Sequence, residues 1–205
     1  MHNEDAVLRH LRSAFKRARK GGRLYYSAGD CNDNYVPFEK VRIDESVRHS
    51  ADLATVKRMF APDARVRVTE TEGIVRIYVG DVPKSLLQTK VSHFSFDLDA
   101  QYTPEEAMIA LVYSPAIDAA AKRLGLHQPD GAIEDVIVEP PLPARPHLPT
   151  VLQDVTLDQA LDAVADTFDG IVEFGVCKNG PIWEANFAGG LDFDEEFDKS
   201  PNDSN

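Results

Sequence analysis

The hydrophobic positions of the chain follow a helical period in some stretches and a strand period in others. Within residues 5–20, apolar residues recur every three or four positions, which places them on one face of a helix, and a Gly-Gly pair then ends the pattern. Residues 66–79 alternate apolar and polar side chains around Glu72-Gly73, which is typical of a β-hairpin. The same criteria predict these further elements: strands at 23–27 and 36–43, a helix at 51–60, a strand at 91–98, a helix at 104–124 broken at Pro115 and capped by Thr103, strands at 133–138 and 151–155, a helix from Thr156 to Phe168, and a hairpin over 171–187.

The order of these elements repeats along the chain. Helix, strand, strand, helix, strand, strand describes residues 5–80, and the same order describes residues 104–188. We therefore predict an α+β protein built from two related small modules, each with helices packed on a small mixed β-sheet. The predicted boundaries are 1–98 for a first module with a basic N-terminal helix, 99–190 for a second module, and 191–205 for an acidic disordered tail.

Charge is distributed unevenly between the two ends. The chain has 205 residues and a formal net charge of −12, which argues against a protein that coats nucleic acid. Basic residues concentrate in the first helix, where they also interrupt any signal-peptide pattern, and acidic residues concentrate after residue 153. No apolar run approaches the ~20 residues of a membrane helix, so we expect no membrane span. This asymmetry indicates contacts with a partner, or between the two ends of the chain.

The second predicted module contains a recognisable sequence segment, LQDVTLDQALDAVADTFDGIVEF, which begins at Leu152. Together with the hairpin that follows, it resembles from Leu152 to Phe187 the short N-terminal (STN) domain shared by secretins and TonB-dependent receptors. The features that carry the resemblance are a strand, a Thr-Leu-x-x-Ala-Leu helix start, a helix that ends near glycine, and a hairpin. The resemblance implies a module of the bacterial cell envelope or periplasm that binds other proteins and performs no chemistry.

An acidic stripe runs along the predicted helix of this second module. Asp158, Asp162 and Asp166 follow one another at a spacing of four residues, so they lie on one helix face. We predict that these aspartates bind a basic protein partner, and the alternative is a solvated face opposite the apolar stripe. A partner that donates a β-strand to an exposed sheet edge is a second expected mode of binding.

The two cysteines, Cys31 and Cys177, are the candidates for a disulfide bond in an oxidising compartment, and two unrelated thiols are the alternative. Their separation excludes a zinc site built from cysteines. Catalytic motifs are not recognisable: no His pair has metalloprotease spacing, and no glycine-rich phosphate loop is present. We therefore predict no catalytic residue, no cofactor and no metal site.

The sequence thus favours a non-enzymatic protein–protein interaction module in the periplasm or cell envelope. Two other interpretations stay open. One is an enzyme of unrecognised type with a cleft between the modules, near the polar loop 30–34 and the tyrosines Tyr25, Tyr26 and Tyr35. The other is a cytoplasmic regulator whose acidic tail mimics a polyanion. The partner, the oligomeric state and the pathway are not encoded in any motif.

Overall fold

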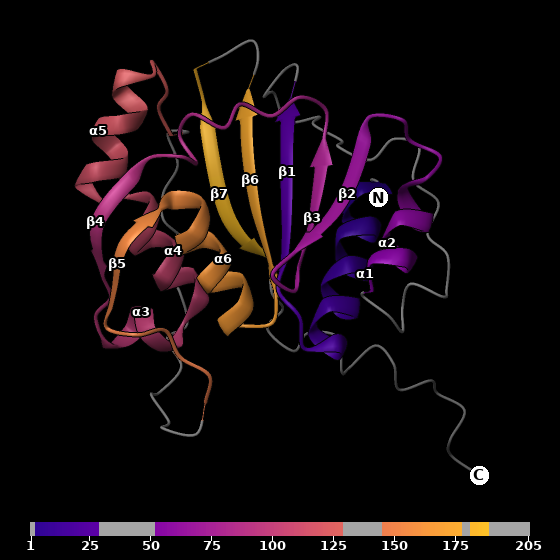
Figure 1. Cartoon of the computed structure of the whole chain (residues 1–205), viewed down its shortest axis with the longest axis horizontal. Coiled ribbons are helices and arrows are strands. Elements are labelled where there is room, and N and C mark those ends of the chain that lie inside the picture. Colours follow the sequence, from indigo (N-terminus) through magenta and orange to yellow (C-terminus); the bar gives the residue numbers. More distant parts are fainter. Residues whose placement is uncertain (1–2, 29–51, 129–144, 178–180, 189–205) are drawn as a thin grey trace.

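The computed structural model describes residues 3–28, 52–128, 145–177 and 181–188. These residues form helices and strands, and Figure 1 shows their arrangement. In chain order they are α1 (Asn3–Ala18), β1 (Gly22–Ala28), α2 (Leu53–Phe60), β2 (Val66–Thr71), β3 (Ile74–Val79), β4 (Lys90–Ser95), α3 (Leu98–Tyr102), α4 (Pro104–Val112), α5 (Pro115–Arg123), β5 (Val151–Thr156), α6 (Leu157–Thr167), β6 (Ile171–Cys177) and β7 (Trp183–Ala188).

Five strands form one mixed sheet in the order β2-β3-β1-β6-β7. The central strand β1 runs parallel to both of its neighbours, β3 and β6. The outer strands β2 and β7 complete antiparallel hairpins with β3 and β6. The two predicted modules therefore contribute strands to the same sheet, joined by β1, and their relationship as duplicated units stays a prediction.

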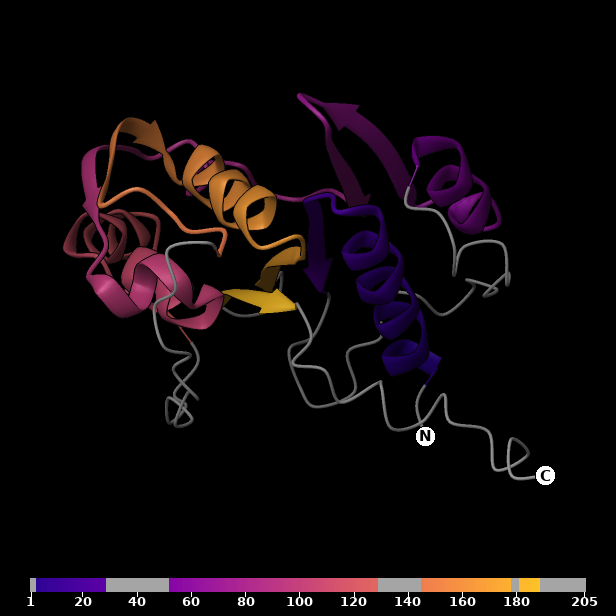
Figure 2. The same cartoon turned by 90° about the horizontal axis from the view of Figure 1, so that it is seen from below.

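Helices cover both faces of this sheet, as Figure 2 shows in a view from below, along the strands. The apolar side of α1, with Leu11 and Phe15, packs with α2 residues and with Leu24 and Ile77 of the sheet. This packing explains the apolar stripe of the basic N-terminal helix. On the opposite face, α6 and α4 cover β1, β6 and β7, and side chains such as Phe174 point into that second core.

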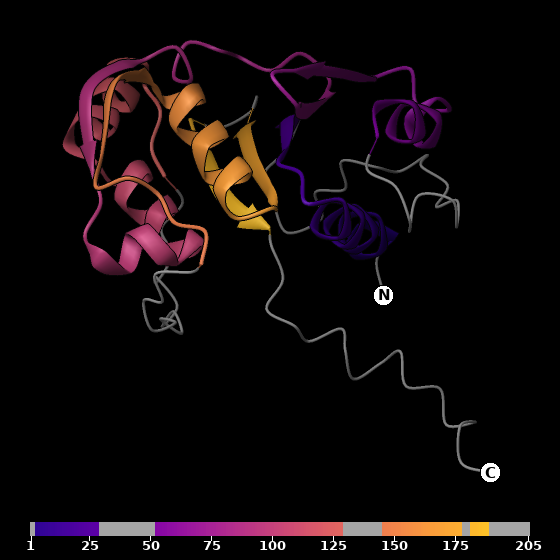
Figure 3. The same ribbon diagram turned by 60° about the horizontal axis from the view of Figure 1, so that its bottom comes forward.

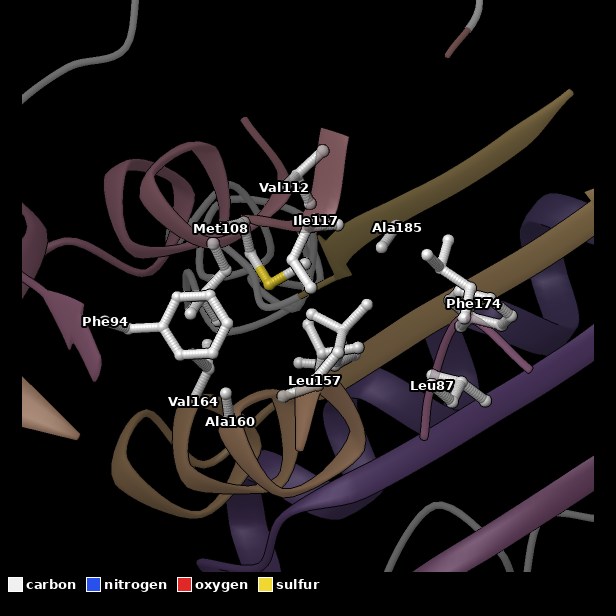
Figure 4. Close-up of a cluster of buried hydrophobic side chains, with 14 of the residues drawn as sticks. Leu87, Phe94, Met108, Val112, Ile117, Leu157, Ala160, Val164, Phe174 and Ala185 are labelled. Atoms are coloured by element: carbon white, nitrogen blue, oxygen red, sulfur yellow. The ribbon is translucent and has the colours of Figure 1, made fainter. Parts of the chain in front are cut away.

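The second core is the larger one, and it gathers side chains from distant parts of the chain. Figure 4 shows Phe94 from β4, Met108 from α4 and Ile117 from α5 converging on the apolar side of α6, where Leu157 and Val164 lie. These five side chains are no more than 4% exposed. Burial of several large side chains, each contributing about 1.5–3 kcal/mol, holds this helical layer on the sheet.

A separate two-stranded sheet lies beyond α6. Strand β4 pairs antiparallel with β5, with Lys90 opposite Thr156 and Ser95 opposite Val151. Figure 3 shows this ribbon bordering the group of α3, α4 and α5, away from α1 and α2. None of the helices in the described ranges is long and apolar enough to cross a membrane.

Most of the predicted elements in the described residues are confirmed, with bounds shifted by at most three residues. The predicted break at Pro115 separates α4 from α5, and Thr156 caps α6 through its side chain in a capping box with Gln159. Two local predictions are wrong. Thr103 occupies the N-cap position of α4 as predicted, but its side-chain oxygen accepts no hydrogen bond from the N–H groups of the first turn. The strand predicted at 91–98 ends earlier, because Asp97 accepts the N–H of Ala100 and starts α3.

The absence of a side chain at Gly175 of β6 is a requirement of packing. The ring of Tyr26 crosses β6 at this position, and its hydroxyl donates to the Glu184 carboxylate on β7. A Cβ atom on Gly175 would lie 2.1 Å from the Tyr26 ring. Glycine therefore lets one aromatic side chain bridge three strands.

Candidate functional site

Two arginines lie on the α6 face of the sheet, where apolar side chains would be expected. The register pairs Arg23 of β1 with Arg76 of β3, and pairs Tyr25 with Tyr78 in the next row of that face. Arg23 is fully buried, and the side chain of Arg76 is only 10% exposed. A buried guanidinium requires an acidic partner, because an unpaired charge in the interior costs several kcal/mol.

The partners are the aspartates of α6. The Arg23 Nη1 atom donates to Asp162 Oδ1 at 2.7 Å and to the main-chain oxygen of Asp158 at 2.9 Å. Its Nη2 atom lies 3.2 Å from Asp158 Oδ1. Arg76 donates to the other carboxylate oxygen of Asp162, so one aspartate bridges two guanidinium groups. Arg76 also donates to the main-chain oxygen of Thr71 at 2.9 Å.

Tyr25 completes this cluster. Its hydroxyl donates to Asp158 Oδ1 at 2.9 Å, and the Arg23 guanidinium lies 4.8 Å from the centre of its ring. Burial raises the pKa of Tyr25 well above its ordinary value, and the aspartates reinforce the rise while Arg23 opposes it. Burial also raises the pKa of Asp162, and the guanidiniums of Arg23 and Arg76 work against that rise. We call these five residues, Arg23, Tyr25, Arg76, Asp158 and Asp162, the arginine–aspartate cluster.

The start of α6 is held in place by main-chain contacts as well. The N–H of Leu157 donates to the oxygen of Thr89, and the N–H of Asp158 donates to the oxygen of Leu87, both at 3.0 Å. These bonds satisfy two of the N–H groups that a helix leaves open at its first turn. The segment before β4 therefore fixes the position from which Asp158 and Asp162 reach the sheet.

The predicted acidic stripe is thus divided by the fold. Asp158 and Asp162 contact the sheet of their own chain, with side chains 24% and 15% exposed, whereas Asp166 is exposed. Sequence reasoning recognised the aspartates and missed the arginines that they bind. One sequence feature could have indicated them: Arg23 lies in a predicted strand and is followed by Leu-Tyr-Tyr. A strand with large apolar side chains on both faces is buried on both faces, and an arginine in it needs an acidic partner. Binding of a further protein by the three aspartates stays a prediction.

A row of stacked groups extends from this cluster to the edge of the sheet. The rings of Tyr25 and Tyr78 are stacked with centroids 4.5 Å apart. The Arg67 guanidinium of β2 lies 4.0 Å from the centre of the Tyr78 ring, and Lys84 Nζ lies 5.2 Å from it. Arg67 and Lys84 are exposed. Their positive charges are therefore presented to solvent beside β2 and held by cation–π contacts.

Strand β2 is an edge strand of the five-stranded sheet. It pairs with β3 along its whole length, and no strand in the described part of the chain pairs with its other side. Arg67, Glu70 and Thr71 are exposed on it, and Val68 is buried. The opposite edge differs, because the start of β7 is covered: the N–H of Trp183 donates to the oxygen of His127 at 3.0 Å.

Several predicted features lie wholly or partly outside the described residues. Cys31, the polar loop 30–34, the strands at 36–43 and 133–138 and the acidic tail 191–205 belong to this group. Cys177 is described and is disulfide-bonded. Within the residues that the structure describes, no group of three or more His, Cys, Asp or Glu side chains is placed to hold a metal ion.

Comparisons with known proteins add no relative. No protein-family model, no curated protein and no solved structure matches the chain.

Proposed function

We propose that this chain is a protein-binding module that accepts a β-strand from its partner at the outer edge of β2. The observation that carries the proposal is the position of β2 at the end of the five-stranded sheet, with no strand in the described residues on its outer side. Unpaired N–H and C=O groups along such an edge are a template for an incoming strand. Main-chain hydrogen bonds would supply affinity, and the neighbouring side chains would supply selectivity.

The charge beside this edge favours acidic side chains on the donated strand. Arg67 projects from β2 itself, and Lys84 lies over the same Tyr78 ring. The contact with Tyr78 orders the Arg67 side chain before binding, which lowers the entropy lost when a carboxylate pairs with it. The expectation of a basic partner rested on the aspartate stripe, and the use of Asp158 and Asp162 inside the fold weakens that expectation.

A cell-envelope or periplasmic location belongs to the same proposal. The disulfide bond at Cys177 supports an oxidising compartment, since stable disulfides are rare in the reducing cytosol. The resemblance of residues 152–187 to STN domains points to the same compartment. Intact-mass analysis of protein taken from the cells that naturally make it tests this part: we expect no free thiol before reduction, and two free thiols would contradict an exported location.

Site-specific photo-crosslinking tests the binding surface. A benzophenone side chain is introduced at Thr71 on β2, at Asp166 on α6, or at Arg123 on α5, three exposed positions on different surfaces. We expect a crosslink from position 71 to an extended, acidic segment of one partner protein, and no crosslink to that partner from position 123. A crosslink to that partner from position 166 but not from position 71 would transfer the binding site to the aspartate stripe.

A pair of charge-reversal variants then tests the selectivity. Arg67→Glu and Arg123→Glu change the net charge equally, so they differ only in position. We expect Arg67→Glu to weaken binding of the crosslinked partner by about tenfold, because a like charge would face its acidic residues, and Arg123→Glu to leave binding unchanged. Equal effects of the two variants would contradict a site at β2.

A further inference from the structure

Two positive side chains from different segments meet over one aromatic ring on the α6 face of the sheet. The ring of Tyr78 on β3 has Tyr25 of β1 stacked on one side, with the ring centres 4.5 Å apart. Strand β2 lies on the other side of β3, and the guanidinium carbon of its Arg67 is 4.0 Å from the centre of the Tyr78 ring. Lys84, from the segment between β3 and β4, places its Nζ atom 5.2 Å from the same centre. Because Tyr25 covers one side of the ring, the two cations share the other side.

These two cations differ from the buried arginines of the same face in having no acidic partner. Arg23 and Arg76 both contact Asp162, whereas neither Arg67 nor Lys84 forms an ion pair in the described part of the chain. Their distances to the ring centre keep the two charges within about 9 Å of each other, which is inside the ~10 Å over which charges interact in 0.1 M salt. Both side chains are exposed, so a counter-ion can reach them from solvent.

A doubly charged anion fits such a pair better than a single carboxylate does. One carboxylate balances one of the two charges, whereas a phosphate ester carries about −1.5 to −2 charges at pH 7 and three strong acceptor oxygens. A guanidinium binds phosphate through two parallel N–H bonds, and a lysine ammonium binds it as a point charge. The contacts with the Tyr78 ring hold both cations in place, so less side-chain entropy is lost when the anion binds.

The surroundings favour a dissolved ligand over a membrane surface. Segments that bind membranes place apolar side chains beside their basic residues, because the apolar groups enter the lipid. The exposed large hydrophobic side chains of the described residues are Leu98, Tyr113 and Leu124, which lie in or next to α3, α4 and α5. Figure 1 shows these helices on the opposite side of the molecule from β2. In the described residues, therefore, no such side chain accompanies the two cations.

We propose that Arg67 and Lys84 form a binding site for the phosphate group of a dissolved phosphate ester. The guanidinium and the ammonium contact different oxygens of the same phosphate, above the ring of Tyr78. The site uses two side chains and no main-chain group of β2. Phosphate binding is therefore separate from the acceptance of a partner strand, and either activity can be present without the other.

The experiment titrates the full chain, with its disulfide intact, with glycerol 3-phosphate and with acetate at constant ionic strength. Shifts of backbone signals in a ¹⁵N–¹H correlation spectrum give both affinities. We expect glycerol 3-phosphate to bind about fivefold more tightly than acetate, because it pairs with a second exposed charge. Lowering the pH from about 7.5 to 5.5 should weaken the ester several-fold and change acetate little, since the ester takes up its second proton near pH 6.

Variants at four exposed positions show whether this pair of cations is responsible. Arg67→Gln and Lys84→Gln should each weaken glycerol 3-phosphate about fivefold. Arg123→Gln on α5 and Lys90→Gln on β4 remove the same charges elsewhere and should change the affinity little. The chain carries a net charge of −12, so general attraction of anions is not expected.

Three results would overturn the proposal. Equal affinities for the ester and acetate would show that the site does not recognise a second charge. Equal effects of the four variants would show that position does not matter. Binding to vesicles that contain phosphatidic acid, without binding of glycerol 3-phosphate, would show a membrane surface in place of a dissolved ester.

Discussion

Removal of the Asp162 carboxylate is the sharpest test of how this fold is held together. In Asp162→Ala, the fully buried Arg23 loses its 2.7 Å bond and Arg76 loses its carboxylate partner. Loss of one member of a buried ion pair costs about 3–5 kcal/mol, because the remaining charge stays out of water without compensation. Two guanidiniums depend on this one carboxylate, so we expect the free energy of unfolding to fall by an amount in the upper part of that range.

Urea denaturation under oxidising conditions measures this quantity. Asp166→Ala is the matched control on the same helix, because that aspartate is exposed, and its effect should stay within about 0.5 kcal/mol. A double variant, Arg23→Met with Asp162→Leu, removes both charges of the Arg23–Asp162 pair. It should be less destabilised than the sum of the two single variants, with a coupling of about 1–3 kcal/mol. A loss below about 1 kcal/mol for Asp162→Ala, or additive effects in the double variant, would refute the view that Asp162 offsets buried positive charge.

Three further predictions concern single positions. Burial raises the pKa of Tyr25, so the folded chain retains the hydroxyl proton above pH 10, where unfolded tyrosines lose theirs. The free energy of unfolding should therefore fall as the pH rises beyond about 10, and it should fall less steeply in Tyr25→Phe. Urea midpoints between pH 8 and 11 measure this difference. Thr156→Ala removes the capping box of α6 and should cost about 0.5–2 kcal/mol in the same assay, whereas Thr156→Ser should cost less. Gly175→Ala places a methyl group in the Tyr26 ring and should lower the free energy of unfolding by about 1–3 kcal/mol, and a second change to Tyr26→Leu should recover part of that loss. Neutral behaviour of Gly175→Ala would contradict the bridge of Tyr26 across β6.

Local elements were predictable because their causes are local. Thr156 and Gln159 lie three residues apart and form the capping box of α6 by themselves, and Pro115 excludes a continuous helix from residue 104 to 124. The same reasoning failed at Thr103, where the residue type favours a cap but the side-chain oxygen accepts no N–H of the first turn of α4. Capping preference describes a residue type, whereas the capping hydrogen bond depends on the rotamer that the side chain adopts in the folded chain.

The candidate site was predictable only in part. The spacing of Asp158, Asp162 and Asp166 shows that they share a helix face, and that inference holds. Which way the face points is set by Arg23, 139 residues away from Asp162 in the chain. The row of Arg67, Tyr78 and Tyr25 likewise exists only because β2, β3 and β1 are neighbours in the sheet.

The sequence by itself therefore determined the helices, the hairpins, the α+β class and the amphipathic faces, since hydrophobic period, caps and turn residues act over a few positions. Tertiary structure decided that β1 lies between two hairpins, that the acidic stripe is partly turned inward, and that β2 is the last strand of the sheet formed by the described residues. Strand order and ion pairing depend on contacts between segments separated by fifty or more positions, such as β1 with β3 and β1 with β6. Those contacts form when the apolar side chains of the whole chain are buried together, and no local pattern encodes them.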